Sequence, residues 1–227
     1  MPACQVNKKN RTQPDLLGIY QLLLGFYGHR NWWPGETQDE IAIGAILTQS
    51  VAWKNVETAL ARLRDQGILT LRDIAAAPAE HIAPLIRSTL YYNQKTQKLK
   101  AFARWFGTTY DFDWRRMFST PVPELRHQLL SLKGLGPETA DSILLYAGRL
   151  PVFVIDAYTR RLFKRLDLTP AKDSYPDWQQ YFSARLPVDP GLYNDFHAQI
   201  VHHCKILCQP VPKCADCPLG HLCPGKT

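Results

Sequence analysis

The stretch Leu132-Lys133-Gly134-Leu135-Gly136-Pro137-Glu138-Thr139-Ala140 decides the fold of this chain. Two glycines on either side of one apolar residue allow a helix to end, the chain to turn tightly and a second helix to begin at the proline. Leu125 and Leu129 lead into the turn at helical spacing and Ile143 follows it, so we expect both helices to face a core. Such a turn leaves backbone N–H groups available at the start of a helix, where they can bind a phosphate.

A single carboxylate, Asp156, follows the short apolar run Val152–Ile155 and opens the next helical segment. There it can face whatever molecule the turn holds, and the two features together suggest chemistry on a nucleic acid. Aspartate is also a favourable residue at the N-cap of a helix. The sequence therefore leaves two compatible interpretations of Asp156 open, a catalytic group and a helix cap.

The composition allows an enzyme of modest size that binds a polyanion. The chain has 227 residues, 45% of them hydrophobic, which is enough for a core in one large domain or two small ones. Lysine and arginine outnumber aspartate and glutamate by 27 to 20, and the net charge of +7 favours a polyanionic partner. No apolar run approaches the roughly 18 residues of a membrane span, and Met1–Arg11 has no apolar signal-peptide core. We therefore expect a cytoplasmic, nucleoid-associated protein with no membrane partner.

The hydrophobic pattern is helical along most of the chain. Apolar residues recur every three or four positions over 56–63, 99–106 and 158–166, which predicts amphipathic helices there. Only Val152–Ile155 resembles a strand, and four residues make a poor one. The predicted fold class is all-α.

Four cysteines close to the end of the chain, Cys208, Cys214, Cys217 and Cys223, form a C-x5-C-x2-C-x5-C array. Disulfides are disfavoured without a signal peptide, so the array predicts a metal site. Zinc and an iron–sulfur cluster both accept four thiolates, and the spacing alone does not choose between them. Cys204 precedes Cys208 by one helical turn, so the identity of the first ligand stays open.

Several motifs in one order carry a family resemblance. They are the hairpin over 132–140, Asp156 at the end of Val-Ile-Asp, Gly44-Ala45-Ile46-Leu47-Thr48-Gln49-Ser50 and Tyr92-Asn93-Gln94-Lys95. With them, the chain from about Trp32 to Cys223 resembles the endonuclease III superfamily of helix-hairpin-helix (HhH-GPD) DNA glycosylases. Trp32-Trp33-Pro34, Leu-Thr-Gln and Gly-x-Glu-x-Ala-Asp are most similar to its 3-methyladenine DNA glycosylase III branch.

The resemblance implies a two-domain, all-α glycosylase fold. A helical barrel over residues 31–150 would end in the helix-hairpin-helix, while residues 1–30 and 151–227 would form the second domain, with DNA across the cleft between them. The cysteine array is similar to the C-terminal loop that carries a [4Fe-4S] cluster in that family, which favours iron–sulfur over zinc. One departure is the first spacing, which is C-x5-C here and usually C-x6-C in the family.

The resemblance also implies a reaction. Cleavage of an N-glycosidic bond passes through an oxocarbenium-like sugar, which the carboxylate of Asp156 would stabilise while orienting or deprotonating water. Glu138 is the second catalytic candidate and stands where bifunctional members carry a lysine nucleophile. Because a carboxylate cannot form an imine, we expect base removal without AP lyase activity. The alternative for Glu138 is a first-turn carboxylate favoured by the helix dipole.

Further residues match positions that contact the base or the duplex in the resembling proteins. The predicted base pocket consists of Trp32, Trp33 and Trp53, with Lys205 nearby. The alternatives are core packing for the aromatic residues and an exposed phosphate-binding role for the lysine. The residues expected to contact the duplex or its phosphates are Gln49, Leu90, Tyr91, Asn93, Lys133, Gly134 and Gly136. A departure is Gln199, where that branch tends to have a lysine.

The sequence thus predicts a monomeric, monofunctional DNA N-glycosylase of base excision repair. Its partner would be double-stranded DNA containing a damaged base, with alkylated purines such as 3-methyladenine first. One alternative is removal of mismatched or deaminated bases by the same fold. The other is a helix-hairpin-helix protein that binds DNA structure and catalyses nothing.

Overall fold

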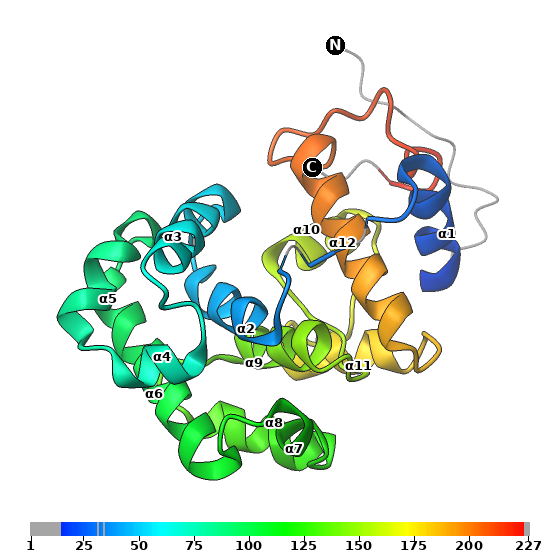
Figure 1. Cartoon of the computed structure of the whole chain (residues 1–227). Helices are drawn as coiled ribbons and strands as arrows, with labels where there is room; N and C mark the ends of the chain where they lie inside the picture. The colour runs from blue at the N-terminus through cyan, green and yellow to red at the C-terminus, as the bar shows by residue number, and fades with distance from the viewer. Residues whose placement is uncertain (1–14, 31, 34, 225–227) are drawn as a thin grey trace. The chain divides into compact units, whose positions relative to one another are not determined.

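The structure is a computed structural model that describes residues 15–30, 32–33 and 35–224. These residues form helices joined by loops, with no strand among them, so the all-α prediction is confirmed. The chain divides into two compact units (Figure 1). The first unit comprises the segments up to Trp33 and from Pro151 onward, and the second unit is Pro34–Leu150. The boundary predicted at Asn31 lies outside the described residues. No helix of the described part is long and apolar enough to cross a membrane.

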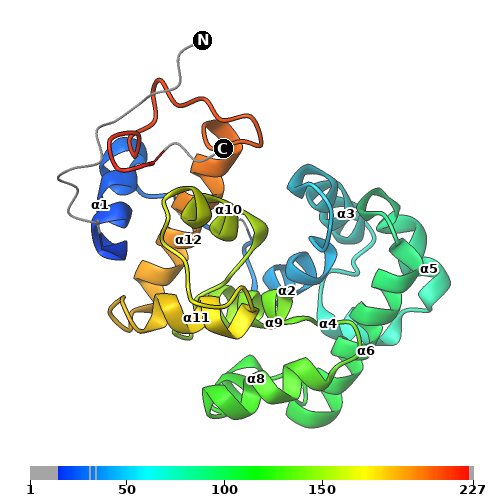
Figure 2. The same cartoon turned by 180° about the vertical axis from the view of Figure 1, so that it is seen from behind.

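The first unit contains helices α1 (Leu16–Tyr27), α10 (Ala157–Arg165), α11 (Tyr175–Ser183) and α12 (Pro190–Ile206). Helix α12 contacts α1 and α10 and lies between them in both views (Figure 1, Figure 2). The aromatic rings of Phe153, Phe163, Phe182 and Phe196 pack against one another in its core. Because α12 is the shared partner of the other helices, its inward face is where distant segments of this unit meet.

The segment Val152–Ile155, which has the composition of a strand, has no regular secondary structure, and the described part of the chain contains no strand with which it could pair. All four side chains are buried. Its backbone is bonded to side chains instead: the Gln179 amide donates to the Phe153 carbonyl at 3.0 Å and Ile155 N–H donates to the Tyr175 hydroxyl at 3.3 Å. The buried segment fixes the start of α10, and therefore the position of Asp156.

The second unit contains a larger set of short helices around one long one. They are α2 (Gln38–Leu47), α3 (Trp53–Asp65), α4 (Leu71–Ala76), α5 (Ala79–Leu85), η1 (Arg87–Thr89), α6 (Tyr92–Tyr110), α7 (Trp114–Phe118), α8 (Val122–Ser131), α9 (Pro137–Ser142) and η2 (Ile143–Ala147). Helix α6 contacts α2, α4, α5 and α7, and it buries Leu99, Phe102 and Phe106 at helical spacing. It is the core helix of this unit.

The hairpin joins α8 to α9 as the sequence predicted. Leu125, Leu129 and Ile143 on its flanks are fully buried. Gly134 makes the turn with a φ of +93°, a conformation that side-chain-bearing residues rarely adopt. Arg126 on α8 donates two hydrogen bonds, 2.7 and 3.1 Å long, to the buried carboxylate of Asp141 on α9. This bidentate pair fixes the two helices of the hairpin relative to each other.

Candidate active site and DNA-binding surfaces

Asp156 is the N-cap of α10, with an extended backbone, and its Oδ1 accepts the Thr159 N–H at 2.7 Å. Its Oδ2 lies 3.6 Å from Nε2 of His197 on α12. Burial raises the pKa of Asp156, but the His197 imidazole and the Thr159 hydrogen bonds lower it by more, so the pKa falls below its ordinary value. The carboxylate is therefore buried and ionised at neutral pH. Asp156 is therefore both the cap of a helix and a buried negative charge.

His197 is a residue of this site that sequence reasoning missed. No metal-ligand spacing links the histidines of α12 to the cysteines, so the sequence gives no reason to single out His197. In the structure the His197 ring is buried, with its centre 6.4 Å from that of Phe153. The contact between His197 and Asp156 joins α12 to the start of α10, and no local pattern in the sequence reports such a pairing.

Three of the predicted pocket residues lie together in the first unit. The rings of Trp32 and Trp33 are half-buried, with centroids 6.0 Å apart. The exposed Lys205 places Nζ 5.7 Å from the centroid of the Trp32 ring, within the range of a cation–π contact. Trp53 belongs to the second unit, where its indole N–H donates to Glu57 Oε1 at 2.9 Å. Aromatic faces and a lysine thus come together around Trp32.

Gln49 follows α2 in the second unit, and its side chain contacts the hairpin. Its side-chain amide donates to the Gly134 carbonyl at 3.1 Å and to the Thr139 hydroxyl at 2.9 Å. Lys98 on α6 donates to Gln49 Oε1 at 2.5 Å. Sequence reasoning missed Lys98, which connects the predicted duplex-contacting glutamine to the turn. The network therefore connects the end of α2 to the hairpin.

The hairpin exposes Glu138 and the residues that the sequence predicts to bind a phosphate. Lys133, Gly134, Gly136 and Glu138 are all exposed, whereas Leu135 between the glycines is buried. Gly136 is the N-cap of α9, and Glu138 lies in the first turn of that helix. The buried leucine therefore anchors a turn whose other residues face solvent.

Leu90 and Tyr91 are two neighbouring exposed side chains just before α6. Their exposed fractions are 55% and 67%, and both have left-handed backbones, with φ of +55° and +43°. Asn93 follows in the first turn of α6 and is exposed. Two large side chains held in water on strained backbone are unusual in a folded domain, and such strain gathers at functional sites.

Three of the four predicted cysteine ligands contact Arg165 or His203. Cys208 Sγ accepts from Arg165 Nη1 at 3.2 Å, Cys217 Sγ lies 3.6 Å from His203 Nε2, and Cys223 Sγ donates to the Arg165 carbonyl at 3.5 Å. Within the described residues no three His, Cys, Asp or Glu side chains are grouped as ligands of a single metal ion. Thiolates that bind different irons of a cluster are further apart than ligands of one ion, so a cluster remains compatible with this arrangement.

The thiols of the array are close enough to affect one another electrostatically. Burial, followed by the Cys208, Cys223 and Cys214 thiols, raises the pKa of Cys217 to about 11. The Cys204 thiol, followed by Arg165, lowers the pKa of Cys208 to about 6. Cys204 itself donates to the Tyr158 carbonyl at 3.5 Å. The neighbours of Cys217 are therefore the other three members of the predicted ligand set.

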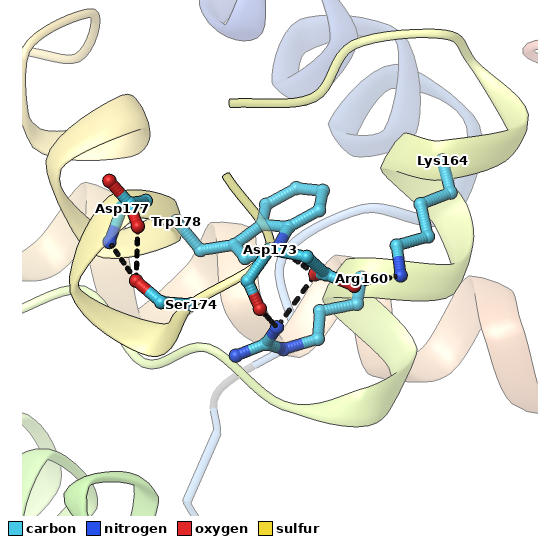
Figure 3. Close-up of polar contacts among 6 residues, drawn as sticks. All are labelled: Arg160, Lys164, Asp173, Ser174, Asp177 and Trp178. Atoms are coloured by element: carbon cyan, nitrogen blue, oxygen red, sulfur yellow. Dashed lines mark hydrogen bonds and ion pairs between the residues drawn. The ribbon is translucent and has the colours of Figure 1, made fainter. Parts of the chain in front are cut away.

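A second polar cluster connects α10 to the loop that follows it (Figure 3). Asp173 Oδ1 accepts from Arg160 Nη1 at 2.8 Å and from the Trp178 indole at 2.6 Å, and its Oδ2 accepts from Lys164 at 2.5 Å. Hydrogen bonds from Lys164 and Trp178 lower the pKa of Asp173 to about 2. Sequence reasoning did not single out Asp173. It attaches the loop before α11 to the helix that Asp156 caps.

Comparison with known proteins decides the family. Residues 43–187 match the HhH-GPD superfamily of base excision DNA repair proteins. The chain belongs to this superfamily. It is 41% identical over 210 residues to a Methanocaldococcus jannaschii protein named as a DNA repair glycosylase, MJ1434, covering 92% of this chain and 95% of that one.

Solved structures agree with the family. The H. pylori 3-methyladenine DNA glycosylase bound to 1,N6-ethenoadenine is similar, with a TM-score of 0.75 and 26% identity over 85% of this chain and 98% of that one. An endonuclease III in a non-covalent DNA complex has the same fold, with a TM-score of 0.76 at 22% identity, covering 91% and 93% of the two chains. The resemblance stated from the motifs is confirmed, and the protein is a base excision repair DNA glycosylase.

Proposed function

We propose that the protein is a monofunctional glycosylase that hydrolytically removes alkylated purines, such as 3-methyladenine, from double-stranded DNA. The observation that carries this proposal is Asp156, a buried carboxylate kept ionised at the start of a helix by His197 and the Thr159 N–H. A fixed negative charge is what an oxocarbenium-like sugar requires. Similarity to the H. pylori 3-methyladenine glycosylase supports the substrate class.

An alkylated purine suits this site chemically. A cationic base such as 3-methyladenine is already a good leaving group, so the site needs little general-acid assistance. The aromatic faces of Trp32 and Trp33 are suited to stacking on a flat cationic ring. Lys205, over the face of the Trp32 ring, would contact the neighbouring backbone or the base edge.

The absence of strand cleavage follows from Glu138. It is an exposed carboxylate in the first turn of α9, at the position where the resembling bifunctional enzymes carry a lysine. A carboxylate cannot attack the sugar to give a Schiff base, so water is the nucleophile and the backbone stays intact. The helix dipole stabilises the charge of Glu138 at this end of α9.

The remaining residues would hold and open the duplex. Lys133, Gly134 and Gly136 would bind a phosphate at the start of α9. Gln49 and the exposed Leu90 and Tyr91, with Asn93 beside them, would occupy the space that a flipped base leaves. Because one chain carries each of these parts, we propose that it acts as a monomer, associated with the nucleoid.

We propose that Cys208, Cys214, Cys217 and Cys223 hold a [4Fe-4S] cluster. The donor set fits, because the Cys208, Cys214 and Cys223 thiols all lie close enough to Cys217 to raise its pKa, and four thiols are the ligands that such a cluster takes. The bond from Cys204 to the Tyr158 carbonyl supports Cys208 as the first ligand. When bound, the cluster supplies a cross-link for the C-terminal loop, since the hydrolysis calls for no electron transfer.

A panel of duplexes, each with a single lesion, tests the proposal. Purified protein is incubated with each duplex, and hot alkali then converts abasic sites into breaks. We expect breaks with alkylated purines, none before alkali, and no protein–DNA adduct trapped by borohydride. Breaks confined to mismatched or uracil-containing duplexes would transfer the assignment to deaminated bases, and an unreacted panel would favour a DNA-binding protein without catalysis.

Asp156→Asn separates chemistry from folding. Asparagine keeps the helix cap but removes the charge, so base release should fall by about 10²–10³-fold, or a few kcal/mol of transition-state stabilisation. Asp189→Asn is the matched control, because Asp189 is the N-cap of α12 and accepts the Gly191 N–H at 2.7 Å. Similar turnover in the two variants would show that Asp156 is only a cap.

A further inference from the structure

Lys95 on α6 is a buried cation bound to the ends of two other helices. Its side chain is 1% exposed, and Nζ donates to the Leu47 carbonyl at 2.8 Å and to the Thr89 carbonyl at 2.5 Å. These residues are the last of α2 and η1, where carbonyls cannot be paired within their own helix. Burial, followed by the charge of Lys98, lowers the pKa of Lys95 to about 8. The ammonium is thus still mostly protonated at neutral pH.

Each of the two carbonyls precedes a segment that the proposed function places in the duplex. Leu47 is followed by Thr48–Ser50, which contains Gln49, and Thr89 is followed by Leu90 and Tyr91. The left-handed backbone of Leu90 and Tyr91 costs free energy and persists only where the surroundings fix it. Lys95 fixes it on both sides, because its side chain holds Thr89 and its own backbone N–H donates to the Tyr91 carbonyl at 3.0 Å.

We propose that Lys95 clamps the segments Thr48–Ser50 and Leu90–Tyr91 into one unit and is thereby a positioning residue for recognition of the damaged duplex. The proposal rests on the proposed function, in which both segments enter the DNA. An ammonium suits the task, because its three donors can bind carbonyls that approach from different elements. A methionine of similar length would fill the space and bind neither carbonyl.

Lys100 on the same helix provides a matched control. It is 6% exposed and donates to the Ile74 and Ala75 carbonyls at 3.2 Å, and also to the Ala77 carbonyl. It therefore binds the end of α4 as Lys95 binds the ends of α2 and η1. The following residue, Ala77, has an extended backbone, and the proposed function assigns it no contact with DNA. Lys100→Met reports the cost of losing a buried lysine without touching the clamp.

Amide hydrogen exchange on the full chain tests the clamp without DNA. The amides at positions 48 and 95 are bonded to the Gly44 and Tyr91 carbonyls. Lys95→Met should accelerate exchange at both by on the order of tenfold, and Lys100→Met at neither. Acceleration in only one segment, or equal acceleration in the two variants, overturns the clamp. If Lys95→Met does not fold, Lys95→Gln, which keeps donors for one carbonyl, takes its place with Lys100→Gln as control.

Binding measurements then test recognition. The probe is a duplex with a stable abasic analogue, compared with the same duplex undamaged. Lys95→Met should reduce the preference for the abasic duplex about tenfold, with affinity for the undamaged duplex within about twofold, while Lys100→Met keeps the preference. An unchanged preference in Lys95→Met, with Gln49→Ala and Leu90→Ala both reducing it, overturns the positioning role. If neither alanine variant reduces it, the proposed insertion is wrong, and exchange alone still decides the clamp.

Discussion

Replacing Gly134 with alanine tests the hairpin most directly. Gly134 has a φ of +93°, where an L-residue costs about 1–2 kcal/mol. An added Cβ would also lie 2.7 Å from Cε, 2.9 Å from Cγ and 3.0 Å from Cδ of Lys98. Lys98 must move aside and lose its hydrogen bond to Gln49, worth about 1 kcal/mol. We therefore expect Gly134→Ala to lower the free energy of unfolding by about 2–3 kcal/mol in urea denaturation.

Gly136, two residues further on, is the control for this prediction. Its φ is −86°, and an added Cβ would meet no atom within 4 Å. Gly136→Ala should cost no more than about 1 kcal/mol, the difference between glycine and alanine at an N-cap. Equal losses in the two variants would refute the reasoning, because they would show that neither the left-handed turn nor Lys98 distinguishes the two glycines.

The contribution of Lys98 can be separated from that of the backbone. In a Lys98→Ala background the crowding is removed and only the cost of the positive φ remains, so Gly134→Ala should then cost about 1–2 kcal/mol. An unchanged cost in that background would show that Lys98 yields without penalty. If Gly134→Ala cost almost nothing in that background, the free energy assigned to the positive φ would be wrong.

Three other predictions follow from the described contacts. His197→Phe should raise the pKa of Asp156, so the acid limb of base release, set by protonation of that carboxylate, should move to higher pH; an unmoved limb would show that the imidazole does not hold the charge. Cys217→Ser should lose the visible absorbance and iron of the purified protein, whereas Cys204→Ser should keep both, and the reverse result would change the ligand assignment. Lys133→Ala should reduce the salt dependence of binding to any duplex by about one phosphate contact, and an unchanged slope would remove this lysine from the interface.

Local patterns were sufficient to predict the fold and several candidate site residues. The glycines and proline of the hairpin fix a turn between helices, and the helical spacing of Leu125 and Leu129 indicates the buried side. Asp156 could be singled out because a capping residue that follows a buried apolar run is a local signature. The apolar run before Asp156 is too short for a strand, and its backbone forms hydrogen bonds with side chains instead.

The residues that sequence reasoning missed act through contacts between distant segments. Lys95 stood within a recognised motif, but its importance lies in two carbonyls of other helices, and carbonyls are present at every position of a sequence. Lys98 contacts Gln49, and His197 contacts Asp156. Each pair joins residues that are far apart in the sequence, so no local pattern singles out either residue. Burial of a lysine is also invisible to a hydrophobic pattern, which places charged residues on the surface.

The environment of Asp156 bears on which part of the reaction it serves. Its Oδ1 accepts the Thr159 N–H and its Oδ2 faces His197, and together these hold its pKa below the ordinary value. A general base works best when its pKa lies near the working pH, so a carboxylate with a lowered pKa is a weak acceptor for a proton from water. The same lowered pKa keeps the negative charge in place throughout the reaction. Stabilisation of the oxocarbenium-like sugar is therefore the role that this environment favours in the proposed reaction. For a base that already leaves easily, that stabilisation is sufficient without a strong general base.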